Sequence, residues 1–239
     1  MGSENPRIRA VLFDLGGTLV DERDFATWTD RAKKLYLDFN PDELAHAYQE
    51  MLTETDQEPP NPDPDGRIVE FWRRTLSRAA QKEVTESTVE KFCAMQRENP
   101  TPLQIFSDTR RCLEQLKREH RALGVVSNST SEARVRQILD RVGILDYFER
   151  IVSSGTEGVE KPNPEIFLRA VRRMSVDAGD ALYVGNLAYT DAKAAQAAGL
   201  RSVWLNREGF GFGEDPPEIT SLLEVPLCVR RIEMGLPIV

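Results

Sequence analysis

Apolar residues occur in short runs along much of the chain, and each run is bounded by turn residues. The first run begins at Ala10 and ends at a single carboxylate, Asp14, which a Gly-Gly turn follows at once. Short apolar runs of this kind are typical of strands buried on both faces of a parallel sheet. Four further runs have the same character, at residues 122–126, 150–153, 181–185 and 201–205. The pattern therefore predicts five short strands.

Segments with apolar residues at helical spacing separate these runs in the second half of the chain. Ser131 is suited to cap a helix that Gly143 ends, and Pro164 is suited to open the next helix. An Ala-rich helix is expected over residues 191–198. Strands that alternate with helices predict a parallel sheet with right-handed crossovers, which is a Rossmann-like α/β fold.

The pattern changes between Val20 and about Asn99, where no strand is indicated. Helices are expected there over residues 26–39, 41–53, 68–80 and 87–97, with a Pro-rich acidic loop at 56–66. The predicted organisation is an α/β core formed by residues 1–19 and 100–239, with an all-helical domain of residues 20–99 inserted after the first strand.

Two expectations concern the chain after this insertion. Asp108 precedes a segment with apolar residues at helical spacing and is expected to cap that helix. From Gly209 onward the chain is expected to form a loop, with one short helix near residues 219–223.

Composition limits the class of partner. Of 239 residues, 40% are hydrophobic and 29% are charged, which is ordinary for a globular protein with a sizeable core. The net charge of −8 repels a polyanion and argues against nucleic acid as the main partner, whereas a small-molecule substrate remains compatible. No apolar run reaches the length of a membrane span, so no membrane partner and a cytoplasmic location are expected. The three scattered cysteines are expected to be buried, reduced thiols. The sequence indicates no particular oligomeric state.

Polar residues that could take part in catalysis or ligand binding follow the ends of the predicted strands. They form four segments, Asp14-Leu-Gly-Gly-Thr18, Ser127-Asn128-Ser129, Glu160-Lys161-Pro162 and Gly185-Asn-Leu-Ala-Tyr-Thr-Asp191. Open α/β sheets bind their ligands at the carboxyl ends of the strands, so we expect a site there. Asp14, at the end of the first strand, is the candidate nucleophile.

The four segments, in this order and on this pattern of strands and helices, resemble subfamily I of the haloacid dehalogenase superfamily over essentially the whole chain. The resemblance implies that the helical insertion is a cap domain and that the activity is Mg²⁺-dependent hydrolysis of a small phosphorylated metabolite. Asp14 matches the nucleophile that forms an aspartyl-phosphate. Ser127 would donate a hydrogen bond to the phosphoryl group, and Lys161 would place an ammonium beside the nucleophile and the phosphate.

Further binding residues follow from the same comparison. Backbone N–H groups around Gly17 and Thr18 are expected to help bind the phosphate, and Asn128 lies beside Ser127. The resemblance implies that Mg²⁺ is held by the Asp14 carboxylate, the Gly16 carbonyl, Asn186 and Asp191.

Two departures from the family pattern affect these expectations. Asn186 stands where the family has an acid, so the Mg²⁺ site is expected to be weak because an amide adds no negative charge. Gly16 stands where the family has a second Asp that acts as general acid and base, a function worth roughly 10²–10⁴-fold in rate.

Three functions are therefore considered. The leading one is a phosphatase, with a substrate whose leaving group needs little protonation. The second is a 2-haloacid dehalogenase type of C–X hydrolysis, because such enzymes release a halide that needs no proton and carry a Ser-Asn pair and an Asn at the positions of Ser127-Asn128 and Asn186. Arg23 and Arg31 are available in the helical insertion to bind a carboxylate or halide. The third is a binding or regulatory protein with vestigial catalysis.

Overall fold

The computed structural model describes residues 7–58, 64–209 and 215–238. The chain divides into two compact units, one formed by residues 1–21 and 103–239 and the other by residues 22–102. Within the described ranges, no helix is long and apolar enough to cross a membrane.

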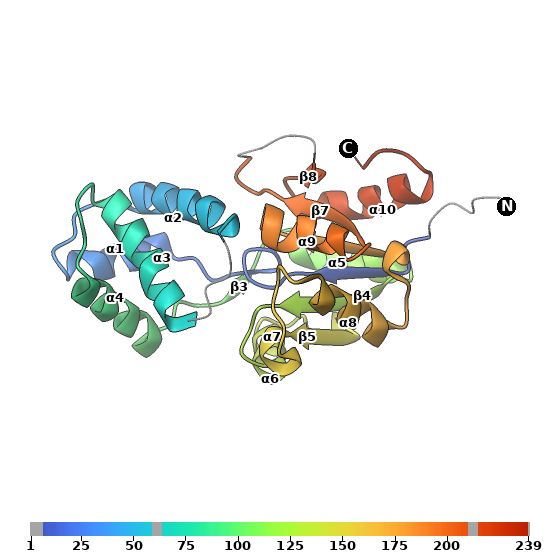
Figure 1. The fold of residues 1–239 in the computed structure, drawn as a ribbon, viewed down its shortest axis with the longest axis horizontal. Helices are drawn as coiled ribbons and strands as arrows, with labels where there is room; N and C mark the ends of the chain where they lie inside the picture. Colours follow the sequence, from blue (N-terminus) through green and yellow to red (C-terminus); the bar gives the residue numbers. More distant parts are fainter. Residues whose placement is uncertain (1–6, 59–63, 210–214, 239) are drawn as a thin grey trace. The chain divides into compact units, whose positions relative to one another are not determined.

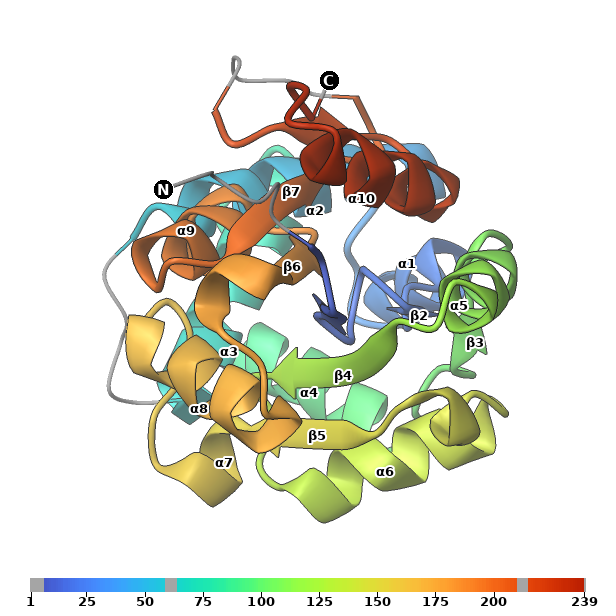
Figure 2. The same cartoon turned by 90° about the vertical axis from the view of Figure 1, so that its right-hand side faces the viewer.

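The core unit is built on a six-stranded parallel sheet (Figure 2). Its strands, in spatial order, are β5 (Arg150–Ser153), β4 (Ala122–Ser127), β1 (Ala10–Phe13), β6 (Ala181–Gly185), β7 (Arg201–Leu205) and β8 (Glu218–Ile219). The five predicted strands are confirmed, and the sixth, β8, has only two residues. In the sheet register Phe13 lies beside Val125 and Val184, so β1, β4 and β6 end at the same edge. This register brings three of the four polar segments to one place.

Helices cover both faces of this sheet (Figure 2). One apolar cluster contains Val11 and Phe13 of β1 together with buried residues of α5 (Thr109–Arg118), α6 (Glu132–Arg141) and α10 (Val225–Glu233). The opposite cluster contains Ala10 and Leu12 with residues of α8 (Pro164–Met174) and α9 (Ala194–Ala197). Alternate residues of β1 thus enter opposite layers, which explains why the strand is apolar throughout.

Shorter elements complete the core unit. They are the antiparallel pair β2 (Val20–Asp21) and β3 (Gln104–Ile105), the helix α7 (Ser154–Glu157), the π-helix η3 (Ala188–Lys193), and the 3₁₀ turns η1 (Leu145–Tyr147), η2 (Ala178–Asp180) and η4 (Leu222–Glu224). The predicted helix over 191–198 therefore begins as a π-helix and becomes α-helical only at Ala194. The expected short helix near residues 219–223 is found in part, since β8 occupies the start of this range and the 3₁₀ helix η4 begins at Leu222. The expected loop from Gly209 onward lies outside the described residues at 210–214 and is wrong further on, because α10 (Val225–Glu233) follows η4.

The helix-end signals are confirmed at three of four positions, including Pro164, which opens α8. The Ser131 side chain accepts a hydrogen bond from the Arg134 N–H at the start of α6, and Gly143 follows that helix with a φ of 72°. Asp108 precedes α5, but its side chain makes no capping bond to the helix. That expectation was wrong, because the Asp108 carboxylate is bound by Arg207, Ser221 and the Leu222 N–H instead.

The second unit is all-helical, with its four helices clustered in Figure 1. They are α1 (Phe25–Lys33), α2 (Pro41–Asp56), α3 (Pro64–Ala79) and α4 (Glu86–Glu98). The expected first helix, 26–39, was too long, since the chain leaves the helix after Lys33 and Tyr36 adopts a left-handed φ of 61°. A capping box between Asn40 and Glu43 then starts α2. Trp28, Leu44, Leu76, Phe92 and neighbouring apolar residues form the core of this unit.

Candidate active site

The turn after β1 holds its own backbone in place. The Leu15 carbonyl accepts hydrogen bonds from the N–H groups of Leu19 and Val20, at 2.9 and 3.0 Å. The Gly17 N–H donates to the Val20 carbonyl at 2.9 Å. That N–H is thus bonded within the turn in this structure, and the contact of Gly17 with a phosphate stays a prediction. Gly17 is needed for another reason: its φ is 77°, and a Cβ at this position would lie 2.5 Å from Asn186 Nδ2.

A buried cluster of charges joins three of the predicted segments. Lys161 Nζ donates to Asp14 Oδ1 and to Asp191 Oδ1, each at 2.6 Å. The three residues are 4%, 7% and 0% exposed, respectively. The cluster therefore contains two carboxylates and one ammonium, and it carries a net charge of −1 when all three groups are ionised.

Tyr183 on β6 is a fourth member of this cluster and belongs to none of the four polar segments. Its hydroxyl donates to Asp191 Oδ1 at 3.0 Å and accepts from Lys161 Nζ at 3.1 Å. The Leu187 N–H donates to the other oxygen, Asp191 Oδ2, at 3.1 Å. A tyrosine in an otherwise aliphatic run, two residues before Gly185, was the available signal.

Burial changes the proton affinities in this cluster. Burial is the main reason that the pKa of Asp14 is raised from 3.8 to about 6, against the attraction of Lys161. Burial opposes the charge of Lys161 as well, but the two carboxylates outweigh it and raise the pKa of the ammonium. Burial and the neighbouring carboxylates raise the pKa of Tyr183. Near neutral pH, Asp14 is thus ionised and Lys161 is charged.

Ser127 and Asn128 stand at the end of β4, at the same edge of the sheet as Asp14. Ser127 is the last residue of β4 and is 8% exposed. The Asn128 side chain donates through Nδ2 to the Lys161 carbonyl at 2.9 Å and accepts through Oδ1 from the Lys161 N–H at 2.8 Å. Both polar atoms of Asn128 thus hold the backbone of Lys161, and its contact with a substrate stays a prediction.

Thr18 and Asn186 connect the first and fourth segments. The fully buried Thr18 donates from Oγ1 to Asn186 Oδ1 at 3.3 Å. The Asn186 carbonyl accepts a hydrogen bond from the indole N–H of Trp204 at 3.0 Å. Asn186 is therefore fixed from both its side chain and its backbone beside the turn after β1.

The oxygen atoms at this edge fit a magnesium ion with few charged ligands. Asp14 supplies a carboxylate and Asn186 an amide oxygen, which are hard donors of the kind Mg²⁺ accepts. The Gly16–Val20 bridge is formed by the Leu15 carbonyl and the Gly17 N–H, which leaves the Gly16 carbonyl outside it. Both oxygens of Asp191 already accept hydrogen bonds. In the described part of the chain, no group of three or more His, Cys, Asp or Glu residues is placed to hold a metal.

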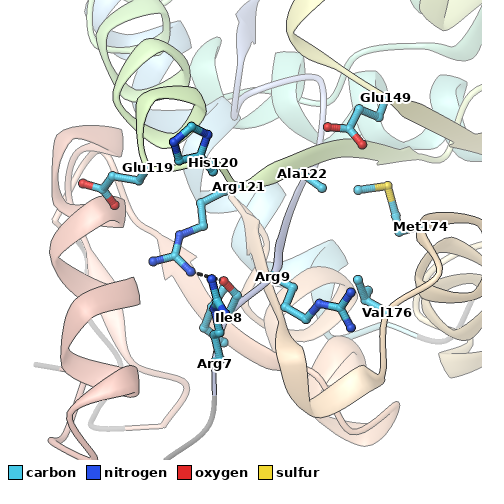
Figure 3. Close-up of a pocket in the computed structure, with 10 residues that line it drawn as sticks. All are labelled: Arg7, Ile8, Arg9, Glu119, His120, Arg121, Ala122, Glu149, Met174 and Val176. Carbon is cyan, nitrogen blue, oxygen red and sulfur yellow. Dashed lines mark hydrogen bonds between the residues drawn. The ribbon is translucent and has the colours of Figure 1, made fainter.

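A cavity of about 450 Å³ lies away from this edge, at the amino ends of β1 and β4 (Figure 3). Its lining includes Arg7, Arg9 and Arg121, and Arg121 pairs with Glu233 at 2.7 Å. The helices α5 and α8 end beside it. Because helix C-termini carry partial negative charge, arginines are favourable there without any ligand. This cavity is not part of the candidate active site.

A Rossmann-like sheet with a buried carboxylate at the end of its first strand, bound by a lysine, is typical of hydrolases of the haloacid dehalogenase type. The chain belongs to the haloacid dehalogenase-like hydrolase family, whose sequence model matches residues 8–199. Glyceraldehyde 3-phosphate phosphatase from Methanopyrus kandleri is 28% identical over 207 residues, which cover 84% of this chain and 84% of that protein. The resemblance noted in the sequence is confirmed, and the protein is a hydrolase.

Relatives that are named as 2-haloacid dehalogenases show a similar degree of sequence identity to this chain. (S)-2-haloacid dehalogenase 2 from a Pseudomonas species is 25% identical over 231 residues, covering 91% of this chain and 93% of that protein. The solved structure of a 2-haloacid dehalogenase from Pseudomonas syringae pv. Tomato has a TM-score of 0.57 and 27% identity, and the match covers 94% of this chain and 99% of that one. These comparisons therefore leave both kinds of hydrolysis to be tested.

Proposed function

We propose that this protein is a phosphatase that hydrolyses small phosphate esters or anhydrides through an aspartyl-phosphate on Asp14. The observation that carries the proposal is the contact between Asp14 and the buried ammonium of Lys161, at 2.6 Å. A carboxylate beside a fixed positive charge can approach an anionic phosphoryl group, whose transition state requires charge neutralisation more than covalent help.

The reaction has two displacements. An oxygen of Asp14 attacks phosphorus, and the bond from phosphorus to the leaving oxygen breaks. Because Gly16 has no acidic side chain, the leaving group departs as an anion or takes its proton from solvent. Water then attacks the phosphorus of the aspartyl-phosphate, which releases phosphate and restores the Asp14 carboxylate.

Two residues support the phosphoryl group in this scheme. Ser127 donates a hydrogen bond to one of its oxygens, and Lys161 neutralises charge on the nucleophile and the phosphate. Tyr183, Asp191 and Asn128 hold Lys161 by its side chain and its backbone. Asp191 is therefore proposed mainly as the anchor of this lysine.

Magnesium is proposed to bind weakly, held by Asp14, the Gly16 carbonyl and Asn186. When bound, the ion supplies positive charge to the phosphoryl oxygens. The helical unit, residues 22–102, is proposed to be the cap domain that selects the substrate. Because the Methanopyrus relative is named for glyceraldehyde 3-phosphate, that compound belongs in the first set of substrates.

The proposal is tested by measuring phosphate release from aryl, acyl and sugar phosphates, with Mg²⁺ and with a chelator. The matched variant is Asp14→Asn, which keeps the shape of the side chain but cannot form the intermediate. We expect turnover by the wild type and a loss of several orders of magnitude in the variant. Turnover that survives in Asp14→Asn would exclude the mechanism.

A second candidate is hydrolysis of a carbon–halogen bond. Two residues that differ from the family's phosphatase pattern favour this reaction. Gly16 offers no proton to a leaving group, and Asn186 adds no charge to a metal site. In that reaction Asp14 attacks carbon and a halide leaves, and water then hydrolyses the ester. Release of chloride from 2-chloropropionate, undiminished by a chelator and without phosphatase activity, would replace the first proposal with this one.

A further inference from the structure

Arg207 lies in the loop after β7 and reaches the turn that follows β1. Its Nη2 donates to the Thr18 carbonyl at 2.9 Å. The side chain is 15% exposed. Arg207 belongs to none of the four polar segments, so the motifs in the sequence gave it no role.

The guanidinium of Arg207 is fixed on two other sides. It pairs with Asp108 through Nη1 at 2.8 Å and Nη2 at 3.1 Å, and it stacks on the Phe106 ring with Cζ 3.8 Å from the centroid. The Ser221 hydroxyl and the Leu222 N–H also donate to Asp108, at 2.8 and 2.9 Å. A planar fork held in this way loses little further freedom when it binds a carbonyl.

The next carbonyl of the turn, that of Leu19, is bound by residues on either side of Asp108. The Leu19 carbonyl accepts from Thr109 Oγ1 at 3.0 Å and from the Phe106 N–H at 3.4 Å. Two successive carbonyls of the turn are thus bound from outside it, and Arg207 is the charged donor. Thr18 in turn donates its hydroxyl hydrogen bond to the Asn186 amide.

We propose that Arg207 is a positioning residue of the active site, which fixes Thr18 by its carbonyl and, through the Thr18 hydroxyl, sets the position of Asn186. The expected effect of Arg207 on the reaction rate rests on the proposed function. The expected effect of Arg207 on the order of the turn after β1 does not depend on that function. Arg207 touches neither the substrate nor the reacting atoms in this account.

The test compares Arg207→Gln and Arg207→Lys with a matched control, Arg230→Gln. Arg230 also pairs with a carboxylate in the core unit, Glu119, at 2.8 Å, but it does not contact the turn after β1. With p-nitrophenyl phosphate as the probe, Arg207→Gln should lower kcat by about 10–100-fold with a smaller change in KM, because small misplacements of catalytic groups have effects of this size. Arg207→Lys should recover part of the loss, and the control should match the wild type.

A readout that does not depend on turnover is hydrogen exchange at residues 15–20. Arg207→Gln should speed exchange there, and the control should not. If the Gln variant does not fold, Arg207→Lys, which keeps the charge next to Asp108, gives the same comparison. Wild-type exchange and wild-type kcat in both Arg207 variants would overturn the proposal. If the wild type hydrolyses none of the aryl, acyl and sugar phosphates, the proposed function fails, while exchange still decides the role of Arg207.

The link to Asn186 is tested by a double-mutant cycle with Thr18→Val, which removes the hydroxyl and keeps the backbone. If Arg207 acts through this hydroxyl, Arg207→Gln should cost less in the Thr18→Val background than in the wild type. If the fold-losses in kcat of the two single variants simply multiply in the double variant, the link to Asn186 is contradicted.

Discussion

Replacing Asp14 with Asn should abolish activity and, at the same time, make the protein more stable. The two carboxylates of the buried cluster share one ammonium, so ionised Asp14 is only partly compensated. The raised pKa expresses this cost, because the folded protein holds the Asp14 proton more tightly than the unfolded chain does. Asparagine keeps the shape of the side chain and removes the uncompensated charge.

The size of the effect follows from the two pKa values. A shift from 3.8 to about 6, at about 1.4 kcal/mol per pKa unit, disfavours folding by about 3 kcal/mol once Asp14 is ionised in both states. Because the folded pKa is raised, the cost is absent below the unfolded value and develops as pH rises through the folded value. It is about half complete near pH 5 and reaches about 3 kcal/mol near pH 8. The attraction of Lys161 is already contained in the folded pKa.

The assay is urea unfolding of the wild type and Asp14→Asn at these two pH values, with a chelator present. Asp140→Asn is the control, since Asp140 is an exposed residue of the same unit. The Asp14 variant should gain up to about 3 kcal/mol near pH 8 and about half of that near pH 5, whereas the control should be unchanged. A variant that is no more stable than the wild type, or a gain that does not grow with pH, would refute the reasoning.

Three further predictions concern the neighbours of Asp14. Mg²⁺ should raise the phosphatase rate with millimolar saturation, and Asn186→Asp should tighten binding by adding a charge, which a metal titration checks; a rate unaffected by a chelator would contradict this. The rate should depend steeply on leaving-group pKa, and Gly16→Asp should rescue poor leaving groups by up to about 10²–10⁴-fold; equally shallow plots of log kcat/KM for both proteins would contradict this. Gly17→Ala should lower both stability and kcat, because its Cβ would meet Asn186 and its φ is 77°; unfolding and kinetics near the wild type would show that the turn adapts.

Much of the fold could be predicted because the core strands are uniformly apolar and end at turn residues. Parallel strands buried on both faces leave this signal directly in the sequence. The C-terminal helix α10 (Val225–Glu233) was missed, although Val225, Val229 and Ile232 are buried at helical spacing. Its second residue is Pro226, which is compatible with a helix only in the first turn.

The site was predictable only where chemistry and strand ends coincide. Asp14 follows that rule directly, because it comes right after β1. Lys161 lies beyond α7, the short helix after β5, and was assigned through its Glu-Lys-Pro motif. The structure brings the two side chains together. Asn128 was expected near the substrate, but its hydrogen bonds run to the backbone of Lys161. Tyr183 and Arg207 could not be assigned, because a contact between residues far apart in the chain depends on tertiary packing. Short motifs contain no record of such contacts.

The most direct test of the central claim is mass spectrometry of the peptide that contains Asp14, after rapid acid quenching of the wild type during turnover of an acyl or aryl phosphate. We expect one added phosphoryl group on Asp14, which is absent from Asp14→Asn treated in the same way. Steady turnover with an unmodified Asp14 peptide at every quench time, or a phosphoryl group on another residue, would contradict it.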